Sequence, residues 1–294
     1  MIPPEVLRQI RRLQFKARRA VKDLLGGEYH SVFKGRGLAF EDVREYQPGD
    51  DIRTIDWNVT ARMGQPFVKR FIEERELTVL LLVDASGSQQ FGTQRQQKRE
   101  VLAELAAVLA FSAISNNDKV GLLTFTDRVE RFVPARKGAR HVLRLIRDVL
   151  FFQPTGRGTC LREALDYLNR VQRRRAIVFL LSDFLDRGFE RAFKLTGRRH
   201  DLIALRVTDL REEELPAVGL VELEDAETGQ VLLVDTSRRQ VRDALAAAAV
   251  RRREHLRQLA RAAGSDLVEV ATDGQHLDAL IHFFQLRERR LRRT

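Results

Sequence analysis

The chain of 294 residues has a single cysteine, Cys160. With no second cysteine to pair with, it cannot form an internal disulfide, so a disulfide scaffold is excluded and the composition fits a reducing, cytoplasmic environment. No histidine stands near Cys160 in the sequence. We therefore interpret Cys160 as a small buried residue and not as a nucleophile.

Long apolar runs are also missing. No window approaches 18 consecutive apolar residues, and the N-terminal Met-Ile-Pro-Pro-Glu lacks the charged and then apolar layout of a signal peptide. We therefore expect no membrane span and a cytoplasmic protein. At 44% hydrophobic residues, the chain can still bury a full α/β core and carry a small appended unit.

Motifs of common enzymes and nucleotide sites are absent as well. The sequence has no Gly-x-Ser-x-Gly around Ser86 or Ser88 and no Gly-x-x-x-x-Gly-Lys, and its six histidines are scattered. A phosphatase with an aspartyl nucleophile at Asp84 would need a carboxylate at position 86, which is serine. We expect no enzymatic activity, and a metal-dependent phosphoesterase stays as the alternative.

The net charge of +11 is concentrated at the two ends of the chain. Residues 1–25 hold seven basic and two acidic side chains, and residues 283–294 hold five basic and one acidic. Apolar residues at helical spacing predict an amphipathic helix over 6–24 that docks on the main domain. We expect no nucleic-acid partner, although binding through the basic terminal helices is a second alternative.

The most informative segment is residues 77–88, where an unbroken apolar run ends on Asp84, Ser86 and Ser88. Such a run is typical of a strand buried on both faces of a parallel sheet, and ligand sites lie at the carboxyl ends of such strands. One carboxylate and two hydroxyls form an all-oxygen set that suits Mg²⁺ or Mn²⁺. The first hypothesis is therefore a metal site.

Two distant residues extend this set. Thr159 follows the glycines of Gly156-Arg-Gly158, and Asp183 follows a second apolar strand over 176–181. Thr159 could equally cap the helix that begins near Leu161. The pattern resembles the metal-ion-dependent adhesion site of von Willebrand factor A (vWA) domains over residues 77 to at least 207. That resemblance implies metal ligation by Asp84, Ser86, Ser88, Thr159 and Asp183.

Residues 46–62 and 67–76 resemble the signature of the bacterial DUF58 family, in which such a segment precedes a vWA-like domain. The resemblance implies a non-catalytic partner protein, often found alongside MoxR-type AAA+ ATPases. From the residues themselves, Pro48-Gly49 predicts a turn, and we interpret Trp57 as a core anchor.

Alternating apolar strands and helices predict the fold class from residue 77 onward. We expect an α/β domain over 76–294, doubly wound and vWA-like, with a mostly parallel sheet and helices on both faces. A short edge strand is predicted at 131–134 and a hairpin insertion near 218–235. Residues 1–75 are predicted to form an N-terminal helical and extended extension.

The mechanism that follows is metal-mediated binding of a protein partner. Neutral hydroxyls and few direct carboxylates would leave Mg²⁺, or Mn²⁺ or Ca²⁺ in its place, under-neutralised and with one exchangeable water. A carboxylate of a partner could replace that water, and the surrounding surface would supply most of the affinity. The family resemblance suggests that a MoxR-type AAA+ ATPase or its client donates this carboxylate.

Overall fold

The computed structural model describes residues 13–15, 17, 19, 21, 39–72, 76–93 and 96–291. The chain divides into the small unit, Phe33–Leu77, and the α/β unit, Met1–Val32 with Thr78–Thr294. Most of the predicted helix over 6–24 lies outside the described residues, but Leu13, Ala17 and Val21 are buried, as expected for a docked apolar stripe. The extension over residues 1–75 stays a prediction.

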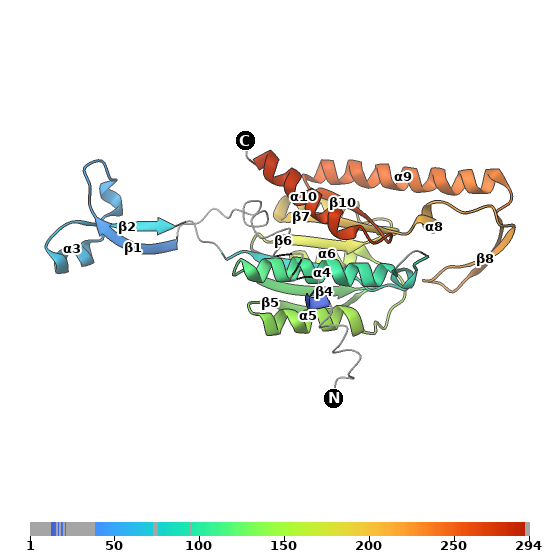
Figure 1. The fold of residues 1–294 in the computed structure, drawn as a ribbon, viewed down its shortest axis with the longest axis horizontal. Helices are drawn as coiled ribbons and strands as arrows, with labels where there is room; N and C mark the ends of the chain where they lie inside the picture. The colour runs from blue at the N-terminus through green and yellow to red at the C-terminus, as the bar shows by residue number, and fades with distance from the viewer. Residues whose placement is uncertain are drawn as a thin grey trace, which may run out of the picture. The chain divides into compact units, whose positions relative to one another are not determined.

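A six-stranded sheet forms the centre of the α/β unit, in the order β10-β7-β6-β3-β4-β5 (Figure 1). The middle strands are β7 (Asp201–Thr208), β6 (Ile177–Ser182), β3 (Thr78–Asp84) and β4 (Lys119–Phe125), with β10 (Asp266–Ala271) at one edge. These five are parallel, whereas β5 (Val129–Arg136) pairs antiparallel with β4 at the other edge. The predicted mostly parallel sheet is confirmed.

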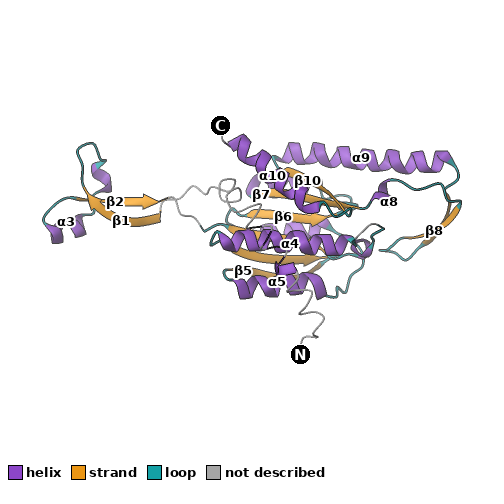
Figure 2. Ribbon diagram, in the orientation of Figure 1, coloured by secondary structure: helices purple, strands orange, loops and turns teal. Residues whose placement is uncertain are grey.

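Helices cover both faces of this sheet (Figure 2). One layer holds α6 (Leu161–Val171), α7 (Glu190–Arg199) and α9 (Arg239–Ala263), and the other holds α4 (Lys98–Ser115), α5 (Ala139–Phe151) and α10 (His276–Leu291). Alternate residues of a strand point to opposite faces, so a strand between two helical layers must be apolar throughout. This explains the unbroken apolar run of β3.

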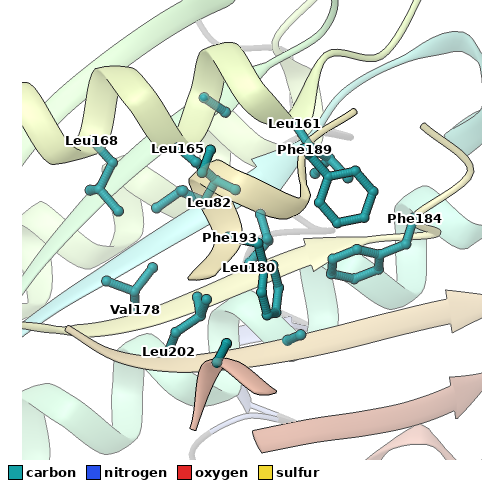
Figure 3. Close-up of a cluster of buried hydrophobic side chains, with 14 of the residues drawn as sticks. Leu82, Leu161, Leu165, Leu168, Val178, Leu180, Phe184, Phe189, Phe193 and Leu202 are labelled. Carbon is teal, nitrogen blue, oxygen red and sulfur yellow. The ribbon is translucent and has the colours of Figure 1, made fainter. Parts of the chain in front are cut away.

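The core between the sheet and the first helical layer is rich in phenylalanine (Figure 3). The ring of Phe189 lies 6.1 Å from that of Phe184 and 6.2 Å from that of Phe193, measured between centroids. Leu82 of β3 and Leu180 of β6 are fully buried in the same cluster. This packing fixes α6 and α7 on the strands whose ends carry the candidate site.

A two-stranded hairpin follows β7 and the short helix α8 (Leu210–Glu213). Its strands, β8 (Leu220–Glu224) and β9 (Val231–Asp235), pair antiparallel and lie where the sequence predicts them. None of the side chains in either strand is buried. The hairpin therefore gains little stability from its own apolar residues.

The small unit is built on a second two-stranded antiparallel sheet, β1 (Ala39–Glu45) and β2 (Phe67–Ile72). The 3-10 helix η2 (Ile52–Thr54) and α3 (Trp57–Met63) connect its strands. The carboxylate of Asp56 caps α3 by accepting bonds from the backbone N–H groups of Asn58 and Val59. Trp57 is 66% exposed, so its interpretation as a core anchor is wrong. It is the first residue of α3, and the described residues of the small unit do not cover it.

Replacing Phe193 by alanine should destabilise the α/β unit severely. The ring is fully buried beside Phe189, and its removal leaves a large cavity, which typically costs about 3–5 kcal/mol. Leu195 of the same helix is 46% exposed and provides the matched control. In urea unfolding, Leu195→Ala should cost less than about 1 kcal/mol. Equal losses in the two variants would contradict the described core.

Candidate metal and partner-binding site

The candidate site lies where two neighbouring strands end. β3 and β6 are parallel partners, with Val83 opposite Leu181. Asp84 is the last residue of β3, and Asp183 directly follows β6. Parallel register thus brings together two carboxylates that are far apart in the sequence. They lie along the edge formed by the carboxyl ends of the strands, where open α/β folds bind ligands.

A buried network of hydrogen bonds links these carboxylates. Asp84 accepts hydrogen bonds from the Ser86 backbone N–H (2.9 Å) and from the Ser182 hydroxyl (2.6 Å). The hydroxyls of Ser86 and Ser88 are 3.1 Å apart, and Ser88 donates to Asp183 Oδ2 at 2.7 Å. Four of the five residues chosen from the sequence therefore meet in one network.

The fifth residue, Thr159, is brought to the same edge by backbone bonds. The Gly87 N–H donates to the Arg157 carbonyl at 2.8 Å, which ties the loop before α6 to the loop after β3. The Thr159 hydroxyl makes no hydrogen bond to the four residues above and instead donates to Glu227 Oε1 at 2.5 Å. Glu227 lies in the turn of the β8-β9 hairpin, so a fourth segment of the chain reaches the site.

A lysine also enters the site. Lys98 is the first residue of α4 and is fully buried. Its Nζ lies 2.7 Å from Asp183 Oδ2 and 2.6 Å from Glu212 Oε1 on α8. Burial alone would lower the pKa of Lys98, but the negative charges of Asp183 and Glu212 outweigh it and raise that pKa. The ammonium therefore stays charged and compensates part of the negative charge.

Negative charge is nevertheless in excess at this edge. Burial, followed by the nearby charge of Asp183, raises the pKa of Asp84 to about 7 from an ordinary 3.8. Burial also raises the pKa of Glu227, to which the charge of Asp183 adds. Burial likewise raises the pKa of Glu212 despite the attraction of Lys98. Additional positive charge would relieve these costs.

The donor set fits a small divalent cation. Octahedral coordination at about 2.0 to 2.1 Å places neighbouring ligand oxygens about 2.9 Å apart. The spacings of 3.1 Å between Ser86 and Ser88 and of 2.7 Å between Ser88 and Asp183 are close to this value. In the described part of the chain, no group of three or more His, Cys, Asp or Glu side chains could hold an ion. Any ion would therefore rely on hydroxyl oxygens, as the sequence pattern implies, and the ligand roles of the five residues stay a prediction.

Sequence reasoning missed four side chains of this site: Ser182, which bonds to Asp84, and the charged Lys98, Glu212 and Glu227. Lys98 does carry a signal, since it is a cation at the start of a helix that is apolar almost all round. The position of Glu227 depends on where a hairpin turn docks, which no local pattern indicates.

A model of the family described as "Protein of unknown function DUF58" matches residues 42–255. The uncharacterized protein Rv1480 of Mycobacterium tuberculosis is 34% identical over 291 residues, covering 97% of this chain and 91% of that protein. Among solved structures, the conserved hypothetical protein BatB from Bacteroides thetaiotaomicron matches 72% of this chain and 99% of its own, with 18% identity and a TM-score of 0.45. The SpRpn10 VWA domain matches 70% and 94%, with 15% identity and a TM-score of 0.42.

Replacing Asp84 by asparagine should stabilise the metal-free protein, and more so at high pH. Because the pKa of Asp84 is raised from 3.8 to about 7 on folding, the folded state keeps a proton between these pH values that the unfolded state has lost. The free energy of unfolding of the unmodified chain therefore falls as pH rises through this window. In the presence of a chelator, Asp84→Asn should raise the unfolding free energy by about 2–3 kcal/mol more at pH 8 than at pH 5.

The control is Asp243→Asn on α9, whose exposed carboxylate pairs with Arg239. Its effect on the unfolding free energy should be small and independent of pH across this range, because exposed pairs contribute little. If Asp84→Asn raised the unfolding free energy equally at both pH values, the raised pKa of Asp84 and the excess of negative charge at the site would be contradicted.

Proposed function

Because this chain belongs to the DUF58 family, whose description assigns no activity, we propose its function from the site itself. It is a non-catalytic protein-interaction module that binds a carboxylate of its partner through a divalent cation, Mg²⁺ or in its place Mn²⁺ or Ca²⁺. The vWA-like fold is in general that of a protein-interaction domain. The ligands in this proposal are Asp84, Ser86, Ser88, Thr159 and Asp183.

The observation that carries the proposal is the buried hydrogen-bond network that runs from Asp84, through the backbone N–H of Ser86 and the hydroxyls of Ser86 and Ser88, to Asp183. Side chains from separate segments would not be expected to converge on excess negative charge unless something compensates it, because burying unpaired charge is costly. Lys98 supplies one positive charge. A divalent cation would supply the rest, together with a Lewis-acidic position for an incoming carboxylate.

The chain's own residues keep such a position attractive to an anion. The hydroxyls of Ser86, Ser88 and Thr159 are neutral, and Lys98 already occupies Oδ2 of Asp183. Direct neutralisation of the ion by this chain would therefore be small. A partner carboxylate would gain both from the ion and from the positive charge of Lys98 nearby.

For the partner, we propose a MoxR-type AAA+ ATPase or its client, in line with the family resemblance.

The alternative of nucleic-acid binding through the C-terminal helix has less support. Arg287 pairs with Asp201 and Asp266, and Arg290 pairs with Asp266. These arginines are thus partly neutralised within the α/β unit. In the part of the chain that the structure describes, no helix is long and apolar enough to span a membrane, and we propose a cytoplasmic location.

The proposal predicts that Asp84→Ala abolishes Mg²⁺ binding while the protein stays folded. Loss of the carboxylate removes a ligand and also a buried charge whose ionisation is unfavourable, so the fold should tolerate the change. Titration calorimetry with MgCl₂ and MnCl₂ measures ion binding, and circular dichroism checks the fold. Asp243→Ala, at an exposed position of α9, should bind the ions as the unmodified chain does.

The same variants test partner capture. With the MoxR-type ATPase as the probe, a pull-down should succeed with Mg²⁺, fail with a chelator and fail with Asp84→Ala. Capture that is unaffected by the chelator would contradict the proposal. Turnover of phosphate esters with Mg²⁺ or Mn²⁺ that disappears in Asp84→Asn would instead support the phosphoesterase.

A further inference from the structure

The turn of the β8-β9 hairpin places a carboxylate at the candidate ion site. Glu227 accepts a hydrogen bond from Thr159, a predicted ligand, and is close enough to Asp183 for its charge to be felt. We propose that Glu227 is an internal ligand of the bound cation, in the position that a partner carboxylate would take. This inference rests on the proposed function and adds to it a competitor built into the chain.

The tip of the hairpin is closely packed on the loop that follows β3. A Cβ atom added to Gly87 would lie 2.3 Å from the Ala226 carbonyl oxygen, far inside any allowed contact. Glycine at position 87 therefore permits the turn to approach the loop between Ser86 and Ser88. The approach brings the residue after Ala226 directly to the site.

The turn has a defined conformation that presents Glu227. Asp225 Oδ1 accepts bonds from the backbone N–H groups of Glu227 (2.9 Å) and Thr228 (3.2 Å). The Gly229 N–H donates to the Asp225 carbonyl at 2.7 Å, and Gly229 has a φ of 72°, which glycine adopts without strain. The Glu227 side chain thus leaves a pre-formed turn, which lowers the entropy lost when it binds an ion.

The rest of the hairpin is weakly held. Leu220, Leu232 and Leu233 are 68%, 62% and 65% exposed, so the strands bury little apolar area against the α/β unit. Docking of the tip then depends on a few contacts around Glu227, Thr159 and Gly87. Apart from the bond between Glu227 and the ion, a partner carboxylate that replaces Glu227 therefore has few contacts to displace.

Ion binding should change the sign of the charge interaction at the tip. Without a cation, the Glu227 and Asp183 carboxylates repel each other; a divalent ion between them attracts both. The internal ligand therefore docks more firmly when the ion is bound. In this arrangement, Glu227 occupies the coordination position of the ion that would otherwise be open to a partner. A partner carboxylate must therefore compete with Glu227 for that position.

The test compares Glu227→Gln with Glu222→Gln, a matched control on an exposed position of β8. With MgCl₂, hydrogen exchange of the amides at 225–230 should slow in the unmodified chain and in Glu222→Gln but not in Glu227→Gln. Calorimetry should show that Glu227→Gln weakens Mg²⁺ binding by about tenfold or more. With Mn²⁺ alone as the probe, water-proton relaxivity per bound ion should rise in Glu227→Gln, because water fills the vacated position.

Equal Mg²⁺ affinity, relaxivity and tip exchange in all three proteins would overturn the internal ligand and leave the proposed function intact, provided that Asp84→Ala still abolishes ion binding. If the unmodified chain binds neither Mg²⁺ nor Mn²⁺, the proposed function fails, and the internal ligand fails with it. Slowed tip exchange that persists in Glu227→Gln would show that other contacts hold the hairpin, which also overturns the inference.

Discussion

The repulsion between Asp84 and Asp183 is the constraint on which the site depends. Parallel pairing of β3 with β6 places both carboxylates at one sheet edge, where both are buried. Each neighbouring group responds to this charge: Ser182 and the Ser86 N–H bond to Asp84, whereas Ser88 and Lys98 bond to Asp183. The strand pairing places the two carboxylates close together, and the loops supply the polar atoms that lower the cost of burying them.

The parts that sequence reasoning reached are those governed by local pattern and sheet topology. Unbroken apolar runs identify β3 and β6, and polar residues at their carboxyl ends follow directly from that identification. Half of the residues of α7 are charged and few are apolar, so its sequence gives only a weak helical pattern between β6 and β7. A parallel crossover nonetheless needs an element to cover the sheet, and α7 supplies it.

The parts that sequence reasoning missed depend on long-range placement. Lys98 reads as an ordinary residue of the first helical turn, and only the fold shows that its ammonium lies between Asp183 and Glu212. Glu227 reads as one residue of a polar turn, and its role appears only once the tip is seen against Gly87. The prediction for Trp57 was wrong in the opposite direction, since the size of the side chain suggested burial and it is 66% exposed.

Lys98 and Glu227 act in opposite senses on Asp183. The lysine is fully buried and belongs to a long helix, so its positive charge is a permanent part of the site. Glu227 lies in the turn of the β8-β9 hairpin, whose strands have no buried side chains. Its carboxylate can therefore move away from the site. In the proposed site, a fixed ammonium and a removable carboxylate would favour exchange of one carboxylate for another over release of the metal. Such exchange would suit the proposed interaction module, which would then change partners while its ion site stays assembled.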